Sequence, residues 1–179
     1  MNRTGYVCLM AEYNKRMNTR IYDAAGRLSA DALGAHRGAF FGSILGTLNH
    51  LIVADTIWLK RFALHPADHV ALAPIHALSL PTSLDQVVCN ELESLAQRRS
   101  LLDQIIIDWS KSVVEIDLDH ILVYGTLKGL RAQKNFFSLL MHFFNHQTHH
   151  RGQTSTLLMQ ASIDIGVTDL MQLIPDECL

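Results

Sequence analysis

The sequence predicts an all-α protein, a four-helix bundle with a short extra helix at its carboxyl end. Four long segments place apolar residues at the three- and four-residue spacing of an amphipathic helix. No internal repeat, low-complexity tract or Gly/Ser linker interrupts them. The chain has 179 residues, of which 49% are hydrophobic, and this is enough to bury one full core. We therefore expect residues 1–179 to form a single domain.

The first two helices are predicted over Gly5–Leu33 and Gly38–Phe62. The first carries a stripe of Tyr, Met, Ala and Leu on one face, and Gly34 fits a carboxyl-terminal cap. The second has a seam of Phe, Leu and Ile at helical spacing, and Pro66 lies just beyond its end. Both patterns are typical of helices that bury one face.

A long connection, residues 63–82, separates the second helix from the third. It contains three prolines and is long enough to cross the end or side of a bundle. Ser83 then fits a helix N-cap, and Gln86 three residues later completes a capping box. We expect the third helix to continue to about Val113.

The last third of the chain contains the longest predicted helix. Before it, Val114–Gly129 alternates apolar and polar residues, which favours extended chain or a small hairpin. The fourth helix is predicted from Leu130 to Ala161. A short last helix is expected after Gly166, with Thr168 as its cap.

The charge balance excludes several classes of partner. There are 15 basic and 17 acidic residues, so the sequence shows neither a basic footprint for nucleic acid nor a polybasic patch for membranes. The apolar run near the amino terminus is too short for a signal peptide, and no segment is long enough for a membrane span. Cys8, Cys89 and Cys178 are far apart and form no CxxC motif. These features predict a cytoplasmic protein with free thiols.

Histidines gather in one stretch of the fourth predicted helix. Four of the ten lie within nine residues: His142, His146, His149 and His150. Side chains four residues apart lie on one helix face and can share a metal ion. His142 and His150 are about 12 Å apart along the axis, so these four cannot all bind one ion.

The apolar stripe of that helix indicates which pair faces the core. It contains two histidines and a glutamine at positions where Leu or Phe is expected; its members are Leu139, Phe143, His146, His150, Gln153 and Leu157. A buried polar group costs free energy unless it is paired, and a shared cation would pair two imidazoles. Two core histidines hydrogen-bonded to other side chains explain the same spacing without a metal.

A metal site with an open position usually has three protein ligands. Among the other histidines, only His50 lies in the middle of a predicted helix, and Gly42 and Gly46 on the same face leave room beside it. A satisfied core histidine is the alternative for this position. His65 and His69 have the same four-residue spacing, but a proline between them and the loop composition disfavour a preformed pair.

Four stretches together resemble the DinB/YfiT-like family. LNHLIVADTIWLKRF at 48–62 and HFFNHQTHHRGQ at 142–153 are similar to its two signatures. YNKRMNTRIYD at 13–23 resembles its amino-terminal element, with Arg16 where Trp is usual, and VTDLMQLIP at 167–175 resembles its carboxyl end. The resemblance implies a homodimeric four-helix bundle with three histidines on one divalent metal. The matching positions are His50, His146 and His150.

The chemistry of such a site narrows the function. Three neutral imidazoles leave a metal its charge and an open position, and we expect zinc or nickel ahead of iron or manganese. Residue 147 is Gln, so the HExxH motif and its general base are missing, which argues against peptide hydrolysis. The resemblance implies a metal-dependent thiol S-transferase that joins a low-molecular-weight thiol to a small electrophile. The alternative is a non-catalytic metal-binding bundle with a structural or sensing role.

Three polar residues beside the predicted ligands have two readings each. Asp55 is either a partner of a ligand histidine or a solvated or capping carboxylate. Gln153 follows the ligand seam and is a candidate for orienting a ligand or a bound water. Arg151 either holds an anionic substrate or forms a salt bridge to another helix.

Overall fold

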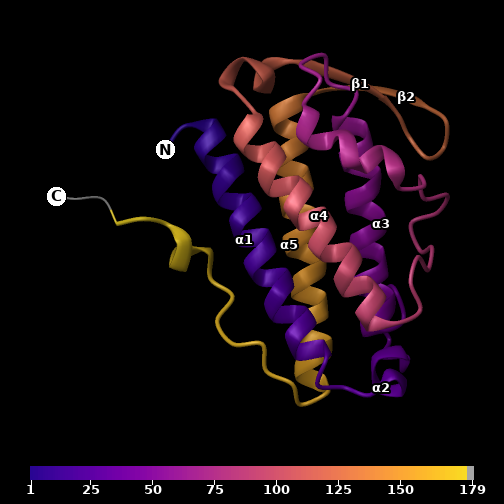
Figure 1. Cartoon of the computed structure of the whole chain (residues 1–179). Coiled ribbons are helices and arrows are strands. Elements are labelled where there is room, and N and C mark those ends of the chain that lie inside the picture. The colour runs from indigo at the N-terminus through magenta and orange to yellow at the C-terminus, as the bar shows by residue number, and fades with distance from the viewer. Residues whose placement is uncertain (177–179) are drawn as a thin grey trace.

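Four long helices lie side by side in the computed structural model, which describes residues 1–176 (Figure 1). They are α1 (Arg3–Ala25), α3 (Ile44–Phe62), α4 (Leu92–Ser112) and α5 (Phe136–Gln160). Helices α1 and α3 each pack against both α4 and α5, so α1 and α3 lie at opposite corners. The chain runs down α1, up α3, up α4 and down α5 in the view of Figure 1.

The structure is mostly helical, and a small two-stranded sheet accompanies the helices. Strands β1 (Ile121–Gly125) and β2 (Arg131–Asn135) form an antiparallel pair, with Ile121 opposite Asn135. The alternating burial of β1 agrees with the extended chain predicted for this region. The second strand occupies residues assigned to the fourth helix, which begins at Phe136 instead of Leu130 because Asn135 caps it through Ser138 N–H.

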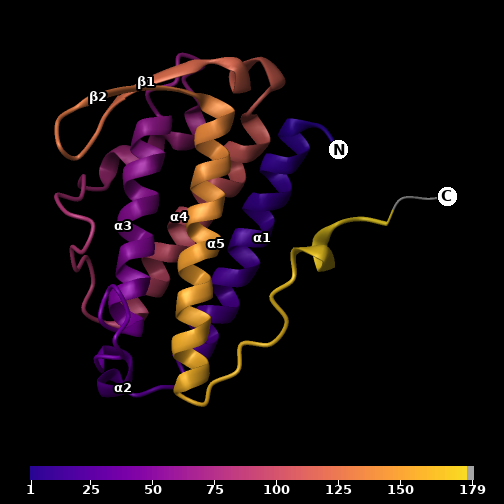
Figure 2. The ribbon, with the colours of Figure 1, turned by 180° about the vertical axis from the view of Figure 1, so that it is seen from behind.

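Short helices fill the connections. They are α2 (Ala30–Gly34) and the 3-10 helices η1 (Val70–Ala77), η2 (Glu115–Asp119) and η3 (Leu170–Leu173). Helix η1 lies in the long connection and packs on α3 and α4, which are parallel neighbours and need such a crossing segment. Figure 2 shows the hairpin over one end of the long helices and α2 at the other.

The predicted first helix is two helices in the structure. Helix α1 ends at Ala25, and a turn over residues 26–29 separates it from α2. The Ser29 hydroxyl caps the new helix by accepting a hydrogen bond from Ala32 N–H at 3.2 Å. The apolar pattern continues through this turn, which is why periodicity alone joined the two helices.

The second helix starts six residues later than predicted, at Ile44 instead of Gly38. Gly38 and Gly42 have φ angles of +69° and +75°, which do not occur in a right-handed helix. Ser43 caps the helix by accepting a hydrogen bond from Gly46 N–H at 3.0 Å.

The prediction of Ser83 as an N-cap is wrong. Helix α4 begins at Leu92, and the residues before it form turns. Gln86 Oε1 accepts a hydrogen bond from Thr82 N–H at 2.8 Å and does not bind the backbone of Ser83. The sequence matches the motif of a capping box, but tertiary contacts hold the segment open.

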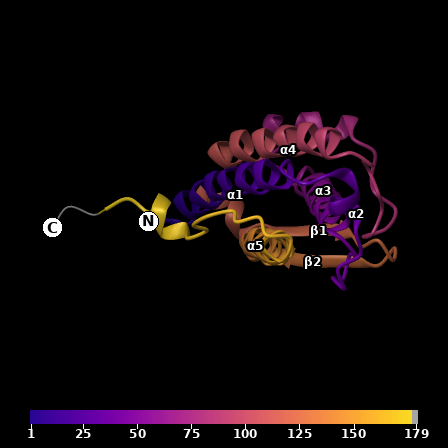
Figure 3. The ribbon, with the colours of Figure 1, turned by 90° about the horizontal axis from the view of Figure 1, so that it is seen from below.

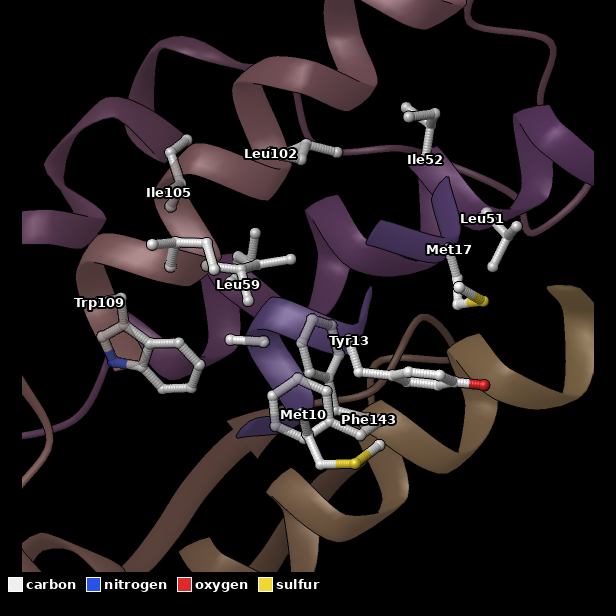
Figure 4. Packing of buried hydrophobic residues seen from close by; sticks show 14 of the residues in the cluster. Met10, Tyr13, Met17, Leu51, Ile52, Leu59, Leu102, Ile105, Trp109 and Phe143 are labelled. Atoms are coloured by element: carbon white, nitrogen blue, oxygen red, sulfur yellow. The ribbon is translucent and has the colours of Figure 1, made fainter. Parts of the chain in front are cut away.

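Aromatic and branched side chains fill the space between the long helices (Figure 4). Trp109 stacks on Phe62 with ring centroids 5.2 Å apart, and both are fully buried. Phe143 from α5 contacts the Phe62 ring edge to face at 5.4 Å. These large rings occupy the end of the core near the hairpin. Toward the other end, buried aliphatic side chains such as Leu48, Ile52 and Leu95 are joined by buried polar groups.

The segment after α5 runs back along α1 (Figure 3). Tyr13 donates a hydrogen bond to the carbonyl of Thr168 at 2.7 Å, and Arg16 donates to Gln172 at 3.1 Å. The predicted last helix is the 3-10 helix η3, which follows Asp169 and has no side-chain cap. Cys178 lies outside the described residues. Within residues 1–176, no helix has the length and apolarity needed to cross a bilayer.

Candidate metal centre

Three histidines from two antiparallel helices converge at one point. The Nε2 atom of His50 in α3 lies 3.3 Å from Nε2 of His146 and 3.2 Å from Nε2 of His150, both in α5. Metal–nitrogen bonds of about 2.0–2.1 Å in a tetrahedral arrangement place two ligand nitrogens about 3.3–3.4 Å apart. The three side chains could therefore hold one divalent ion where they stand.

The backbone before α3 places an aromatic ring on this centre. A Cβ atom on Gly46 would lie 2.1 Å from the carbonyl oxygen of Phe41, so only glycine allows the turn to approach the helix this closely. The Phe41 ring stacks on His50 with centroids 3.8 Å apart and meets His150 edge to face at 5.6 Å. Phe41 thus limits how far these two imidazoles can turn.

Hydrogen bonds at the far side of two rings fix their tautomers. The Nδ1 atom of His50 lies 2.8 Å from the Leu84 carbonyl oxygen, and Nδ1 of His150 lies 2.7 Å from Oε1 of Gln153. Because both oxygens only accept, each Nδ1 carries the proton and each Nε2 presents a lone pair. Two lone pairs that face each other at 3.2 Å repel unless a cation lies between them. The donor set therefore fits a metal ion.

The histidines are also poised to be neutral. Burial lowers the pKa of His146 to about 3, and positive charge on the neighbouring histidines would lower it in the same direction. Burial lowers the pKa of His150 to about 4, although its hydrogen bond to Gln153 acts the other way. Burial also lowers the pKa of His50. Protons are therefore weak competitors for these nitrogens near neutral pH.

A cavity of about 420 Å³ opens onto the centre. His50 and His146 form part of its wall, together with the aromatic residues Trp58 and Tyr124. His142, which is not a member of the apolar stripe of α5, also lines this cavity, and its ring centroid lies 5.1 Å from that of Trp58. A small molecule can therefore reach the point where the three Nε2 atoms meet.

Of the three polar residues beside the ligands, only Gln153 contacts one. Its Oε1 accepts a hydrogen bond from His150 Nδ1–H, and its amide nitrogen lies 3.3 Å from His149 Nε2. Arg151 is buried, donates a hydrogen bond to Asn14 in α1 and stacks on Tyr13. It therefore ties α5 to α1 and does not line the cavity at the centre.

Asp55 is fully buried but does not contact the ligand histidines. Its Oδ2 atom accepts hydrogen bonds from Arg99 in α4 and from Gln147 in α5. Arg99 also forms an ion pair with Asp103 at 3.0 Å. Asp103 accepts hydrogen bonds from Asn14 and Asn18 in α1, and burial raises its pKa. We call these side chains the buried polar network. It links all four long helices one turn away from the metal centre.

A second histidine cluster lies at the other end of α3. It comprises His65, His69 and Asp117, whose possible ligand atoms lie within 4.8 Å of one another. The sequence disfavoured a preformed pair at His65 and His69, and the structure corrects that expectation by bringing the two side chains together. However, His65 already uses both nitrogens. Nδ1 accepts a hydrogen bond from Ala67 N–H at 3.1 Å, and Nε2 lies 3.2 Å from the Asp117 carbonyl oxygen, to which it can only donate.

Sequence reasoning missed two contacts at the first centre. Leu84 orients His50 through its backbone carbonyl, so any residue type could supply that contact. Asn49 holds the loop that carries Leu84, because its side chain accepts from Val88 N–H at 2.8 Å and Cys89 N–H at 3.1 Å. Asn49 stands beside His50 in the matched stretch, and an amide buried in an apolar run could have marked it.

The fold and this centre define a class of mostly helical proteins with a three-histidine group between two helices. Comparison with known families agrees with that class. The DinB family matches residues 1–174, so this chain belongs to the DinB family. No curated protein matches the chain.

Proposed function

We propose that this protein is a metal-dependent thiol S-transferase that acts on a small electrophile, built on one four-helix bundle domain over residues 1–179. The observation that carries the proposal is the 420 Å³ cavity, whose wall includes two of the three converging histidines. A purely structural metal site is expected to be closed by protein ligands. At this centre the side that faces the cavity has no protein ligand among the described residues, so a small molecule can bind there.

The three imidazoles have one task in this proposal, which is to hold the ion with their Nε2 lone pairs. Leu84 and Gln153 keep those lone pairs aimed inward by binding the Nδ1 protons. A divalent ion held there would lower the pKa of a thiol bound at its open position. The sulfur then forms the bond to the electrophilic carbon, the leaving group departs with its bonding electrons, and the thiol proton passes to solvent.

The surroundings argue against hydrolysis of peptides. Gln147 stands where a zinc protease has its glutamate, and its amide is bound to Asp55 inside the buried polar network. Among the described residues that line the cavity, none is an Asp or Glu that could act as a general base on water.

The test is thiol consumption with product analysis. Zinc-, nickel-, iron- and manganese-loaded protein is incubated with several low-molecular-weight thiols and small electrophiles, next to metal-free protein and His146→Ala. We expect the S-substituted product only with metal-loaded wild type and with His149→Ala, whose side chain lies outside the centre. Fully loaded protein that consumes no thiol under any combination would refute catalysis and favour the non-catalytic metal-binding alternative.

We further propose a homodimer that works in the cytoplasm, where the free thiols of Cys8 and Cys89 stay reduced. The dimer is implied by family membership, and the apolar side chains exposed on the helices are compatible with it. Light scattering at micromolar concentration should give twice 20.1 kDa. A single species of the monomer mass would contradict the dimer.

A further inference from the structure

The cavity beside the metal centre has positive charge at its far end. Arg61 and Lys128 line it together with the three histidines His50, His142 and His146. An adjoining cavity of about 570 Å³ shares Arg61 and adds Lys60. Within residues 1–176 no Asp or Glu lines either cavity, so no acidic side chain of this part of the chain balances these cations on the cavity walls.

Two aromatic rings hold the Arg61 side chain. Its guanidinium carbon lies 4.7 Å from the ring centre of Trp58 and 4.9 Å from that of Tyr124. Within residues 1–176 its guanidinium makes no hydrogen bond or ion pair, whereas Arg3 and Arg99 both bind carboxylates. Aromatic faces hold the cation in place by cation–π contact but leave its N–H groups without acceptors.

Burial adds to the demand for an anion. Arg61 is half-buried, and burial lowers the pKa of its guanidinium. A partly desolvated cation without a counter-ion costs free energy, and an incoming anion would recover that cost. A guanidinium edge matches a planar carboxylate through two parallel hydrogen bonds.

A row of rings connects the two ends of the cavity. Arg61 lies three turns after His50 on the same face of α3, so their Cα atoms are about 16 Å apart along the axis. The guanidinium stacks on Trp58, one turn nearer to His50, which shortens the gap. Trp58 contacts His142, and His142 lies 5.9 Å from His146 between ring centroids. An extended aliphatic chain fits along such an aromatic wall.

We infer that the cavity takes a thiol that carries a carboxylate at its other end, with the sulfur at the metal centre and the carboxylate on Arg61. This inference rests on the proposed function for its thiol end only. Lys128, in the turn of the hairpin, adds positive charge near the same end. Arg61 is then a binding residue that selects anionic over neutral thiols.

The test compares two probes of equal length, 6-mercaptohexanoate and 6-mercaptohexanol, by calorimetric titration of zinc-loaded protein. Wild type should bind the acid at least about tenfold more tightly, the size expected of one charge-assisted contact. Arg61→Gln should reduce that preference to less than about threefold, because the carboxylate loses its guanidinium partner. Lys111→Gln, the same charge change on α4 away from both cavities, should behave as wild type.

Hexanoate, which lacks the sulfur, separates this inference from the proposed function. Equal binding of acid and alcohol to wild type, or an unchanged preference in Arg61→Gln, would overturn the carboxylate site even if both thiols bind. Binding of hexanoate that depends on Arg61, without binding of either thiol, would support the site and refute thiol activation. If none of the three probes binds, the carboxylate site is overturned. If Arg61→Gln does not fold, Arg61→Lys should keep the preference in part, because lysine retains the positive charge but cannot form the two parallel hydrogen bonds of a guanidinium.

Discussion

The two histidine clusters of this protein have the same HxxxH spacing but opposite hydrogen-bonding patterns. At His146 and His150, outer contacts bind the Nδ1 proton of His150 and leave Nε2 lone pairs facing inward. At His65 and His69, the backbone itself uses both nitrogens of His65, and Ser112 lies 3.1 Å from Nδ1 of His69. Spacing therefore brings imidazoles together, but the contacts on their other nitrogens decide whether a metal can bind.

The comparison also separates two roles. The first cluster gains a partner only when a cation arrives, whereas the second already connects the loop after α3 to η2. We therefore expect metal binding to depend on the first cluster and folding to depend on the second. Four predictions follow from that contrast, beginning with the largest effect.

Metal content should separate the clusters completely. His146→Ala should lower the metal from about one ion per chain to near zero, because two imidazoles are a much weaker site than three. His69→Ala should keep the full content. Elemental analysis of the dialysed proteins measures both, and His142→Ala and His149→Ala serve as controls that should keep their metal. Full occupancy after separate replacement of His50, His146 and His150 would remove the assignment.

Gln153 should tune affinity without being a ligand. Gln153→Leu removes the acceptor for the His150 Nδ1 proton, and the loss of such a contact typically costs 10–100-fold in metal affinity. Gln153→Glu keeps an acceptor and should bind at least as tightly as wild type. Competition with a chromophoric chelator gives the dissociation constants. Identical constants for the Leu and Glu variants would show that this contact does not matter.

His65→Ala should affect stability and not metal content. The substitution leaves Ala67 N–H and the Asp117 carbonyl without their partner and removes a buried ring that contacts Phe136. We expect a loss of roughly 2 kcal/mol in the free energy of unfolding. That corresponds to a melting temperature lower by about 4–8 °C for a chain of this size. A variant that melts like wild type, or that also loses its metal, would erase the distinction between the clusters.

The smallest effect is a pH dependence of the metal-free protein. The pKa of His146 is about 3 in the folded state and that of His150 about 4, both below the unfolded value near 6.5. The unfolded chain therefore binds more protons, so stability falls as pH drops from about 6.5 toward these values. His146→Ala should lose roughly 1 kcal/mol less than wild type between pH 6.5 and pH 5, after allowance for partial exposure.

Urea unfolding in the presence of a chelator measures this difference. His149→Ala is the matched control, since it also removes one histidine from α5, at an exposed position, and leaves the three converging nitrogens in place. Parallel curves for wild type and His146→Ala would mean that the first cluster does not set the pH dependence.

The sequence predicted the region around the metal centre better than the ends of the helices. The stripe of α5 correctly placed His146 and His150 together because helical geometry alone decides which residues share a face. His50 was singled out as the one histidine in mid-helix, and the structure brings it to the same point. Family resemblance agreed at each of these positions.

Tertiary contacts account for what the sequence did not predict. Ser83 and Gln86 satisfy a local rule, but the Asn49 side chain binds the backbone of residues 88 and 89, which a helix there would have used. A pattern within the segment cannot reveal a partner 40 residues away. The contact made by the Leu84 carbonyl could not be predicted for the same reason. The strand β2 was missed because its sequence, RAQKN, is short and mostly polar and matches a helix equally well.

The buried polar network sets the longitudinal register of the helices. Asp55 lies little more than one turn after His50, and Gln147 directly follows His146, so their hydrogen bond joins α3 and α5 beside the metal centre. A slip of one residue would shift a helix by about 1.5 Å, whereas metal–ligand bonds tolerate about 0.2 Å. Arg99 holds Asp55 from a third helix and resists such a slip. The buried polar network therefore fixes the alignment of the three histidines, although none of its side chains is a metal ligand.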